Sequence, residues 1–249
     1  MSAPAHQLPP AAVASITSSD GAASPESSDA FVRYAGIAGL LVPILAIAIN
    51  VVLLAPPPDP PSGLNAPIAE VAAYVAAKGD MIALGHGLRY VAQILGLIFA
   101  VGLYRLVQGP RDGAHRAWAM VGLLAAFWVP ALAVVAQSVE GVAVWQAQAL
   151  AGQPQLALAL LGISTFVWNS ILVPFSVLLL GFSLAGRGSG TFPHWLVVLG
   201  LLAAASGLLG GFVTASTAGE GWAVPFIAFA VLVQPWMIVT GVMMFRNQA

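Results

Sequence analysis

The residues best suited to chemistry lie within a long apolar stretch. The sequence "GHGLRYVAQILGLIFAVGLYRLV" runs from Gly85 to Val107 and carries His86 and Arg89 near its beginning. An arginine at the centre of a membrane helix costs about 2.5–3.5 kcal/mol on insertion scales, and less near a helix end. His86, Arg89 and Gln93 have the spacing that places side chains on one helical face. We therefore expect Arg89 to face a partner inside a helical bundle.

Glu140 is the acidic residue at the matching depth. Counting about 20 residues outward from Tyr104, an aromatic residue expected at one interface, places Arg89 roughly one turn inside the opposite boundary. The same count from Trp118 reaches Glu140. The pattern predicts an Arg89–Glu140 ion pair with His86 beside it. The pair could link two helices structurally or form part of a binding or proton-handling site. In a third interpretation, Arg89 only snorkels to the interface.

Uncharged polar side chains extend the candidate site toward the centre of the membrane. In membrane helices such groups most often form hydrogen bonds between helices, at about 0.6 kcal/mol each. The alternative is a small polar cavity that binds a ligand. The complete set of candidate binding residues is His86, Arg89, Gln93, Gln137, Glu140, Asn169 and Gln234.

Enzymatic chemistry has little support in the sequence. The chain has no cysteine, which excludes thiol catalysis and cysteine metal sites. His86 is expected at one membrane face, and His115 and His194 at the other, which disfavours a metal centre or a bis-histidine haem. The one lysine, Lys78, is expected in a loop, which excludes a Schiff base within a helix. We expect no catalytic residue, no metal and no cofactor.

The composition indicates that most of the chain is surrounded by lipid. Hydrophobic residues make up 59% of the 249 residues and charged residues only 7%, whereas soluble domains carry about 25% charged residues. The net charge of −1 gives no basic surface for nucleic acid. We predict an all-α, polytopic membrane protein with a six-transmembrane-helix bundle. The expected spans are 33–55, 82–107, 117–145, 156–185, 193–215 and 222–245.

The segments outside the spans predict the domain organisation and the topology. Residues 1–30 are rich in Ala, Pro and Ser and are expected to form a disordered cytoplasmic tail before the membrane domain 31–249. An outer loop, 56–80, should contain a short helix from Ala66 to Lys78 that ends at Gly79. By the positive-inside rule both termini are cytoplasmic. The arginines that indicate this orientation are Arg33, Arg105, Arg111, Arg116, Arg187 and Arg246.

Prolines and small residues indicate how the helices pack. Each proline inside a span removes a backbone donor and tends to kink the helix. Such kinks are a structural feature by default, and in some transporters they form substrate sites. The small residues Ala203, Gly207 and Gly211 share one face, which predicts that their helix is central in the monomer or forms a dimer. The prolines are Pro43, Pro130, Pro174, Pro225 and Pro235.

Three stretches of the chain carry a family resemblance. "RYAGIAGLLVPILAI", the helix "IAEVAAYVAAKGD" and "LVPFSVLLLGFSLAGRGSGTFPHWLVVLGLLAAASGLLGGF" resemble the bacterial DUF4386-type multi-pass membrane proteins. The resemblance covers about residues 31–245 and is most specific at 174–211. It implies six helices and no assigned activity, so it implies no site residues. The stretch "GHGLRYVAQ" departs from the family pattern.

These observations favour a binding or accessory function. We expect an integral protein of the bacterial inner membrane that holds a small or lipid-like ligand, or a partner, at the outer mouth of the bundle. Its partners would be membrane lipids and a membrane protein or a second copy of the chain. The alternative function is a small permease that uses the proline-kinked helices. A permease requires a polar path from Arg89 past Asn169 and Gln234 to the cytoplasm, whereas an accessory protein should have a sealed inner half.

Overall fold

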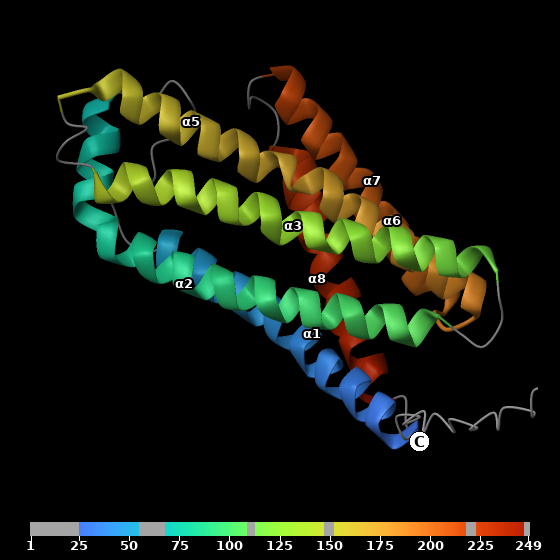
Figure 1. Ribbon diagram of the computed structural model, residues 1–249. Coiled ribbons are helices and arrows are strands. Elements are labelled where there is room, and N and C mark those ends of the chain that lie inside the picture. The colour runs from blue at the N-terminus through green and yellow to red at the C-terminus, as the bar shows by residue number, and fades with distance from the viewer. Residues whose placement is uncertain (1–24, 55–67, 109–112, 147–151, 218–222, 247–249) are drawn as a thin grey trace, which may run out of the picture.

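The computed structural model describes residues 25–54, 68–108, 113–146, 152–217 and 223–246. Side chains are described for 30–49, 77–108, 113–146, 152–213 except 154, and 224–246. All the regular structure in these residues is α-helical (Figure 1). The helices are α1 (Pro25–Leu54), α2 (Ile68–Val107), α3 (Ala114–Trp145), α5 (Pro154–Ser170), α6 (Leu172–Ser189), α7 (His194–Thr217) and α8 (Ala223–Arg246).

Six helical stretches among the described residues are long and apolar enough to cross a membrane, which confirms the predicted all-α fold with six candidate spans; the orientation of the termini stays a prediction. One of these stretches, Gln155–Ser189, includes both α5 and α6. The helix is interrupted at Ile171, three residues before Pro174. Proline has no N–H to donate to the carbonyl four residues earlier, and its ring crowds that carbonyl. The interruption lies at the residue after the carbonyl that Pro174 leaves without a donor, whereas α1, α3 and α8 continue through Pro43, Pro130 and Pro235.

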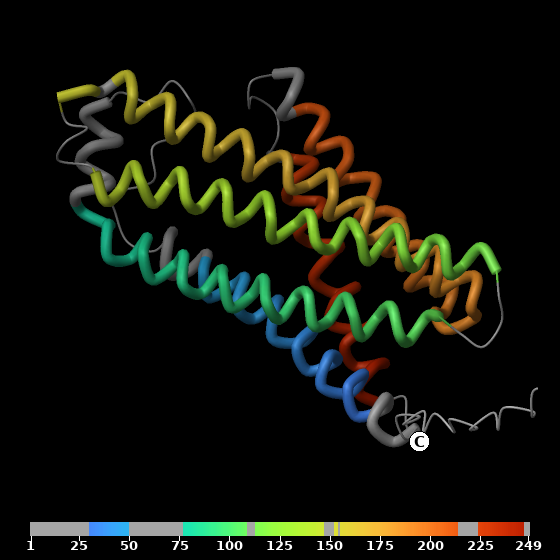
Figure 2. Tube along the Cα trace, viewed as in Figure 1, coloured from blue at the N-terminus to red at the C-terminus, as the bar shows by residue number. Residues whose placement is uncertain are grey.

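Two predicted boundaries differ from the structure. The expected short helix ending at Gly79 is not separate, because α2 runs without a break from Ile68 to Val107. Figure 1 shows that this long helix bends near its beginning. Lys78 therefore lies on a helix, not in a loop, and is 3% exposed. Residues 25–30, predicted to belong to a disordered tail, are helical, because α1 begins at Pro25; residues 1–24 lie outside the described part of the chain (Figure 2).

Pairs of glycines allow two of the helix contacts to be very close. A Cβ atom added to Gly181 of α6 would lie 2.6 Å from the backbone nitrogen of Gly122 in α3. A Cβ on Gly36 of α1 would lie 2.7 Å from the carbonyl oxygen of Gly241 in α8. Helices in lipid associate mainly through such close packing, because lipid supplies no hydrophobic driving force between them. The α3–α6 and α1–α8 pairs are thus fixed by backbone contact.

Helix α7 is central in the monomer, as its small residues predicted. Ala203 is fully buried, and Gly207 and Gly211 are also buried. A Cβ on Gly207 would lie 2.3 Å from Oγ of Ser176 and 2.7 Å from the ring of Phe229. The small face of α7 therefore receives side chains from α6 and α8.

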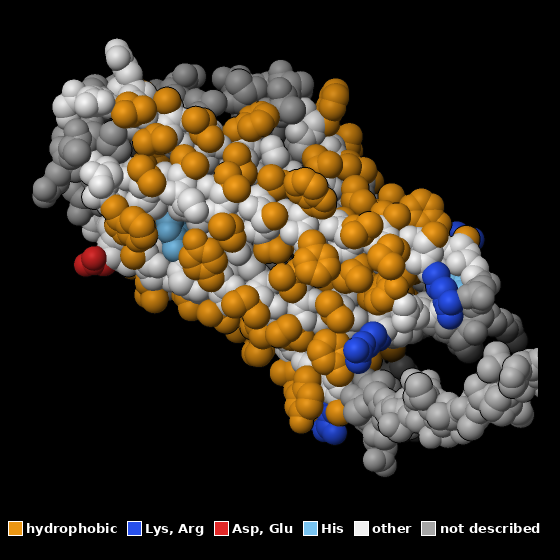
Figure 3. Space-filling view, viewed as in Figure 1, with side chains coloured by type: hydrophobic (Ala, Val, Ile, Leu, Met, Phe, Trp, Pro, Cys, Tyr) orange, Lys and Arg blue, Asp and Glu red, His pale blue; other side chains and the backbone are white. Residues whose placement is uncertain are grey.

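The two ends of the bundle differ in charge. We call the end that carries Arg33, Arg105, Arg116, Arg187 and Arg246 the arginine end, and the opposite end the Glu140 end. The main apolar core lies toward the arginine end, where Phe99, Phe182 and Trp236 are almost fully buried. Figure 3 shows hydrophobic side chains over most of the face between the two ends, with basic side chains at one end. This surface is what six membrane-spanning helices require of a lipid-facing exterior.

Candidate functional site

The candidate site lies between α2 and α3 toward the Glu140 end, where α3 has small residues. Ala133, Ala136 and Gly141 of α3 are buried and face the neighbouring helices. A Cβ on Gly141 would be 4.0 Å from the imidazole of His86, so the ring lies against the glycine backbone. The small side chains of α3 leave room for the long side chains that α2 supplies.

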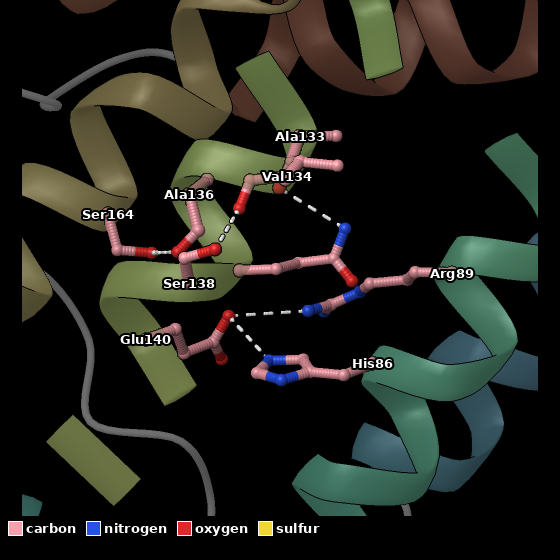
Figure 4. Close-up of polar contacts among 9 residues, drawn as sticks. His86, Arg89, Ala133, Val134, Ala136, Ser138, Glu140 and Ser164 are labelled. Atoms are coloured by element: carbon pink, nitrogen blue, oxygen red, sulfur yellow. Dashed lines mark hydrogen bonds and ion pairs between the residues drawn. The ribbon is translucent and has the colours of Figure 1, made fainter. Parts of the chain in front are cut away.

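His86 and Arg89 of α2 both contact the carboxylate of Glu140 in α3 (Figure 4). Arg89 Nη1 donates a hydrogen bond of 3.3 Å to Oε2 of Glu140. Nε2 of His86 lies 3.2 Å from the same oxygen, but this buried nitrogen has no hydrogen-bond partner with suitable geometry. The contact between His86 and Glu140 is therefore a close electrostatic one. The structure thus confirms the prediction that Arg89 pairs with Glu140 and that His86 lies beside them.

The three side chains are partly exposed. The exposed fraction is 11% for the His86 side chain, 21% for Arg89 and 23% for Glu140. A fully buried ion pair suffers a desolvation cost that can exceed its mutual attraction, whereas a partly exposed pair avoids much of that cost. The site is thus packed enough to hold a defined geometry and open enough to contact a molecule outside the bundle.

Trp168 of α5 completes the site and was not predicted from the sequence. The guanidinium carbon of Arg89 lies 4.8 Å from the centroid of the Trp168 ring, within the range of a cation–π interaction. The available signal was a tryptophan near the middle of an apolar segment, away from the interfaces where tryptophan is enriched. Arg89 is therefore held between a carboxylate and an aromatic ring from different helices.

A hydrogen bond joins α5 to α3 close to the site. Oγ of Ser164 donates to the backbone carbonyl oxygen of Ala136 at 3.0 Å, and Ser164 is 3% exposed. Figure 4 shows Ser164 approaching α3 from the side opposite to Arg89 and His86. This bond helps to fix α5, and with it Trp168, against α3.

The uncharged polar residues do not assemble into the polar cavity that the sequence allowed. Gln137 is 1% exposed and its Nε2 donates to Ala133 O at 3.2 Å, within its own helix. Gln93 and Asn169 are partly buried. Gln234 lies on α8, which packs on α1 and α7 but not on α3 or α5. Among the described residues, no hydrogen bond joins these four side chains to each other or to Glu140.

The arrangement is suited to binding a ligand with hydrogen-bond acceptors. A guanidinium has five N–H donors, and Arg89 donates to Glu140 through Nη1. Donors of Arg89 that are not directed at Glu140 could bind a carbonyl, carboxylate or phosphate oxygen. Lys78, eleven residues before Arg89 and hence on a similar face of α2, adds a second basic group at this end.

Comparisons with protein-family models, with curated proteins and with solved structures found no match for this chain. The resemblance to the DUF4386-type proteins therefore stays a prediction.

Proposed function

We propose that this chain is a membrane binding or accessory protein that holds a small or lipid-like ligand, or a protein partner, at the Glu140 end. The observation that carries the proposal is the position of Arg89, which is fixed by Glu140 and Trp168 yet remains 21% exposed. This exposure leaves N–H groups of Arg89 within reach of a molecule outside the bundle. The preferred ligand has acceptor oxygens, because the site offers arginine and histidine N–H groups.

We also propose that the chain spans a membrane in a defined orientation. Six apolar spans with arginines at one end are consistent with a bacterial inner-membrane protein whose termini are both cytoplasmic. In that orientation the Glu140 site faces the outside of the cell. Lipids, a membrane-protein partner or a second copy of the chain would reach the site from that side. Membership of the DUF4386-type family is compatible with this proposal.

A permease is the second candidate function. Its support comes from buried polar atoms that lack hydrogen-bond partners, among them Oε1 of Gln137 and Oε1 of Gln234. Substrates and water could use such atoms as they pass. Against it stands the apolar core toward the arginine end, where Leu179, Phe182 and Trp236 are fully buried. The two functions therefore differ in whether water reaches that half of the bundle.

The chain is free of cysteine, so single cysteines can report where water reaches. Gly141→Cys places a thiol beside His86 at a position that has room for a side chain. Ser183→Cys is nearly isosteric and places a thiol in the fully buried core of α6. For a binding protein, a small charged thiol reagent should modify Gly141→Cys in liposomes and leave Ser183→Cys unmodified. Modification of both would favour the permease, and protection of both would contradict the proposed open site.

The bound ligand can be sought directly. The wild-type chain and the variant Arg89→Gln/Glu140→Gln are purified identically, and co-purifying small molecules and lipids are measured by mass spectrometry. We expect at least one species to be retained by the wild type and lost from the double variant. Asp80→Asn is the matched control, because Asp80 is an exposed acid at the same end outside the cluster. Identical profiles for all three proteins would contradict ligand binding at this site.

A further inference from the structure

The arginine end presents exposed arginines from five helices. Of the nine acidic residues in the sequence, the structure describes the side chains of two, Asp80 and Glu140, and both lie toward the other end. The part of the arginine end that is described is therefore basic. The exposed arginines are Arg33 of α1, Arg105 of α2, Arg116 of α3, Arg187 of α6 and Arg246 of α8.

Two of these arginines lie over aromatic rings of neighbouring helices. The guanidinium carbon of Arg33 is 4.7 Å from the ring centroid of Phe245 in α8. That of Arg105 is 4.7 Å from the ring centroid of Phe31 in α1. Phe245 directly precedes Arg246, and Phe31 is two residues before Arg33. These contacts place Arg33 beside the last turn of α8 and Arg105 beside the first part of α1. Arg246 is the last residue of α8. We call Arg33, Arg105 and Arg246 the three-arginine cluster.

The guanidinium groups of Arg33 and Arg105 keep hydrogen-bond donors available, because neither donates a hydrogen bond to a residue that the structure describes. Neither Arg33 nor Arg105 forms an ion pair with another residue that the structure describes. Arginine N–H groups bind phosphate oxygens by paired hydrogen bonds. The cluster thus fits a phosphate or phosphodiester group.

An apolar stripe leads from the cluster along α1. Ile37, Leu41 and Ile44 follow Arg33 at four, eight and eleven residues, so they lie on the same side of the helix. All three are exposed, and in a membrane-spanning helix this places them against lipid chains. A ligand that uses both features has an anionic head and a hydrocarbon chain. A soluble phosphate would use only the cluster.

We propose that the three-arginine cluster binds the phosphate headgroup of an anionic phospholipid, with an acyl chain packed along Ile37, Leu41 and Ile44. The site is separate from the Glu140 site and does not depend on the function proposed there. Basic residues near a membrane surface each contribute attraction to anionic lipid, which corresponds to about fivefold in affinity per residue. A zwitterionic phospholipid carries the same phosphate group, but its choline cation is repelled by the arginines, so the cluster favours an anionic headgroup.

The test measures which lipid remains bound to the full chain. The protein is reconstituted in phosphatidylcholine bilayers with a minor fraction of phosphatidylglycerol, extracted in a neutral detergent, and analysed by native mass spectrometry. We expect phosphatidylglycerol to be enriched on the wild type relative to the bilayer. Arg33→Gln/Arg105→Gln should lower the enrichment by about fivefold per arginine removed. Arg33→Lys/Arg105→Lys should retain part of it, because lysine keeps the charge without the planar stacking.

The matched control is Arg116→Gln/Arg187→Gln, which removes the same charge from the same end. It should retain most of the enrichment. Equal losses in the two glutamine variants would overturn the proposal in favour of general surface charge, and so would an unchanged Arg33→Gln/Arg105→Gln variant. Displacement of the lipid by soluble glycerol phosphate would also overturn it, because a headgroup site without a chain contact would be indicated. Gel filtration and circular dichroism show whether each variant is folded, and only folded variants are compared.

Discussion

The Glu140 end and the arginine end of the bundle are held together in different ways. Toward the arginine end, glycines such as Gly122 and Gly181 bring helix backbones into direct contact around an apolar core. Toward the Glu140 end, a carboxylate from α3 contacts two side chains of α2, and Trp168 of α5 covers Arg89. Close backbone packing holds the helices together in the first region, and electrostatic contacts between side chains do so in the second.

The difference indicates where function is to be sought. Close backbone packing in lipid gives stability without any polar group that a ligand could contact. An ionisable group within a membrane-spanning helix is expensive, and such groups usually mark a site of function. The Glu140 end bears that cost, and its three charged or polar side chains remain partly exposed. The arginine end contributes its exposed charges only at the helix termini.

The largest expected effect comes from the glycine contact between α3 and α6. Gly181→Ala places a methyl group 2.6 Å from the backbone nitrogen of Gly122, which cannot move without shifting a helix. We expect a loss of about 3 kcal/mol in unfolding free energy, the upper range for overpacking. Gly87→Ala is the control, because no atom lies within 4 Å of the added methyl group. Equal stability of the two variants in reversible unfolding would contradict packing by backbone contact.

Removing the aromatic cover of Arg89 should have a smaller effect. Trp168→Leu removes the ring that lies 4.8 Å from the guanidinium carbon of Arg89. We expect a loss of about 1 kcal/mol, as for a partly desolvated cation–π contact. Trp128→Leu is the matched control, since Trp128 is 63% exposed toward the lipid side. If Trp128→Leu is as destabilising as Trp168→Leu, then Trp168 acts only through its general hydrophobic area.

The smallest predicted effect concerns the hydrogen bond between α5 and α3. Ser164→Ala removes the donor to Ala136 O and should cost about 0.6 kcal/mol, the average for hydrogen bonds between membrane helices. Ser138→Ala is the control, because Oγ of Ser138 donates to Val134 O within its own helix. We expect the control to be near neutral in the same unfolding measurement. A larger loss for Ser138→Ala would contradict the role assigned to Ser164.

The sequence was sufficient to predict the contacts of Glu140 but not the aromatic part of the site. The face shared by His86 and Arg89 follows from helical spacing, and the height of Glu140 follows from counting residues at about 1.5 Å each. Trp168 could not be assigned in the same way. The residues of α5 itself are apolar both on the face toward lipid and on the face toward the bundle. Their hydropathy therefore does not predict which face of the helix turns toward Arg89.

Helix boundaries were the least predictable part of the fold. Gly79 was expected to end a short helix, as glycine often does, yet α2 continues through it. Glycine permits a helix end without requiring one, and apolar surroundings favour continued backbone hydrogen bonding. Pro174 was predicted to kink its helix, and the interruption lies at Ile171, directly after Ser170, whose carbonyl is the one that the proline leaves without a backbone donor.

The central claim is that Arg89 and Glu140 interact specifically inside the bundle. A double-mutant cycle tests it most directly, with unfolding free energies measured for the wild type, Arg89→Gln, Glu140→Gln and the double variant. We predict a coupling energy of about 1–2 kcal/mol, within the range for contacting residues, so that the double variant is more stable than the sum of the single losses implies. Additive losses with a coupling energy near zero would contradict the account.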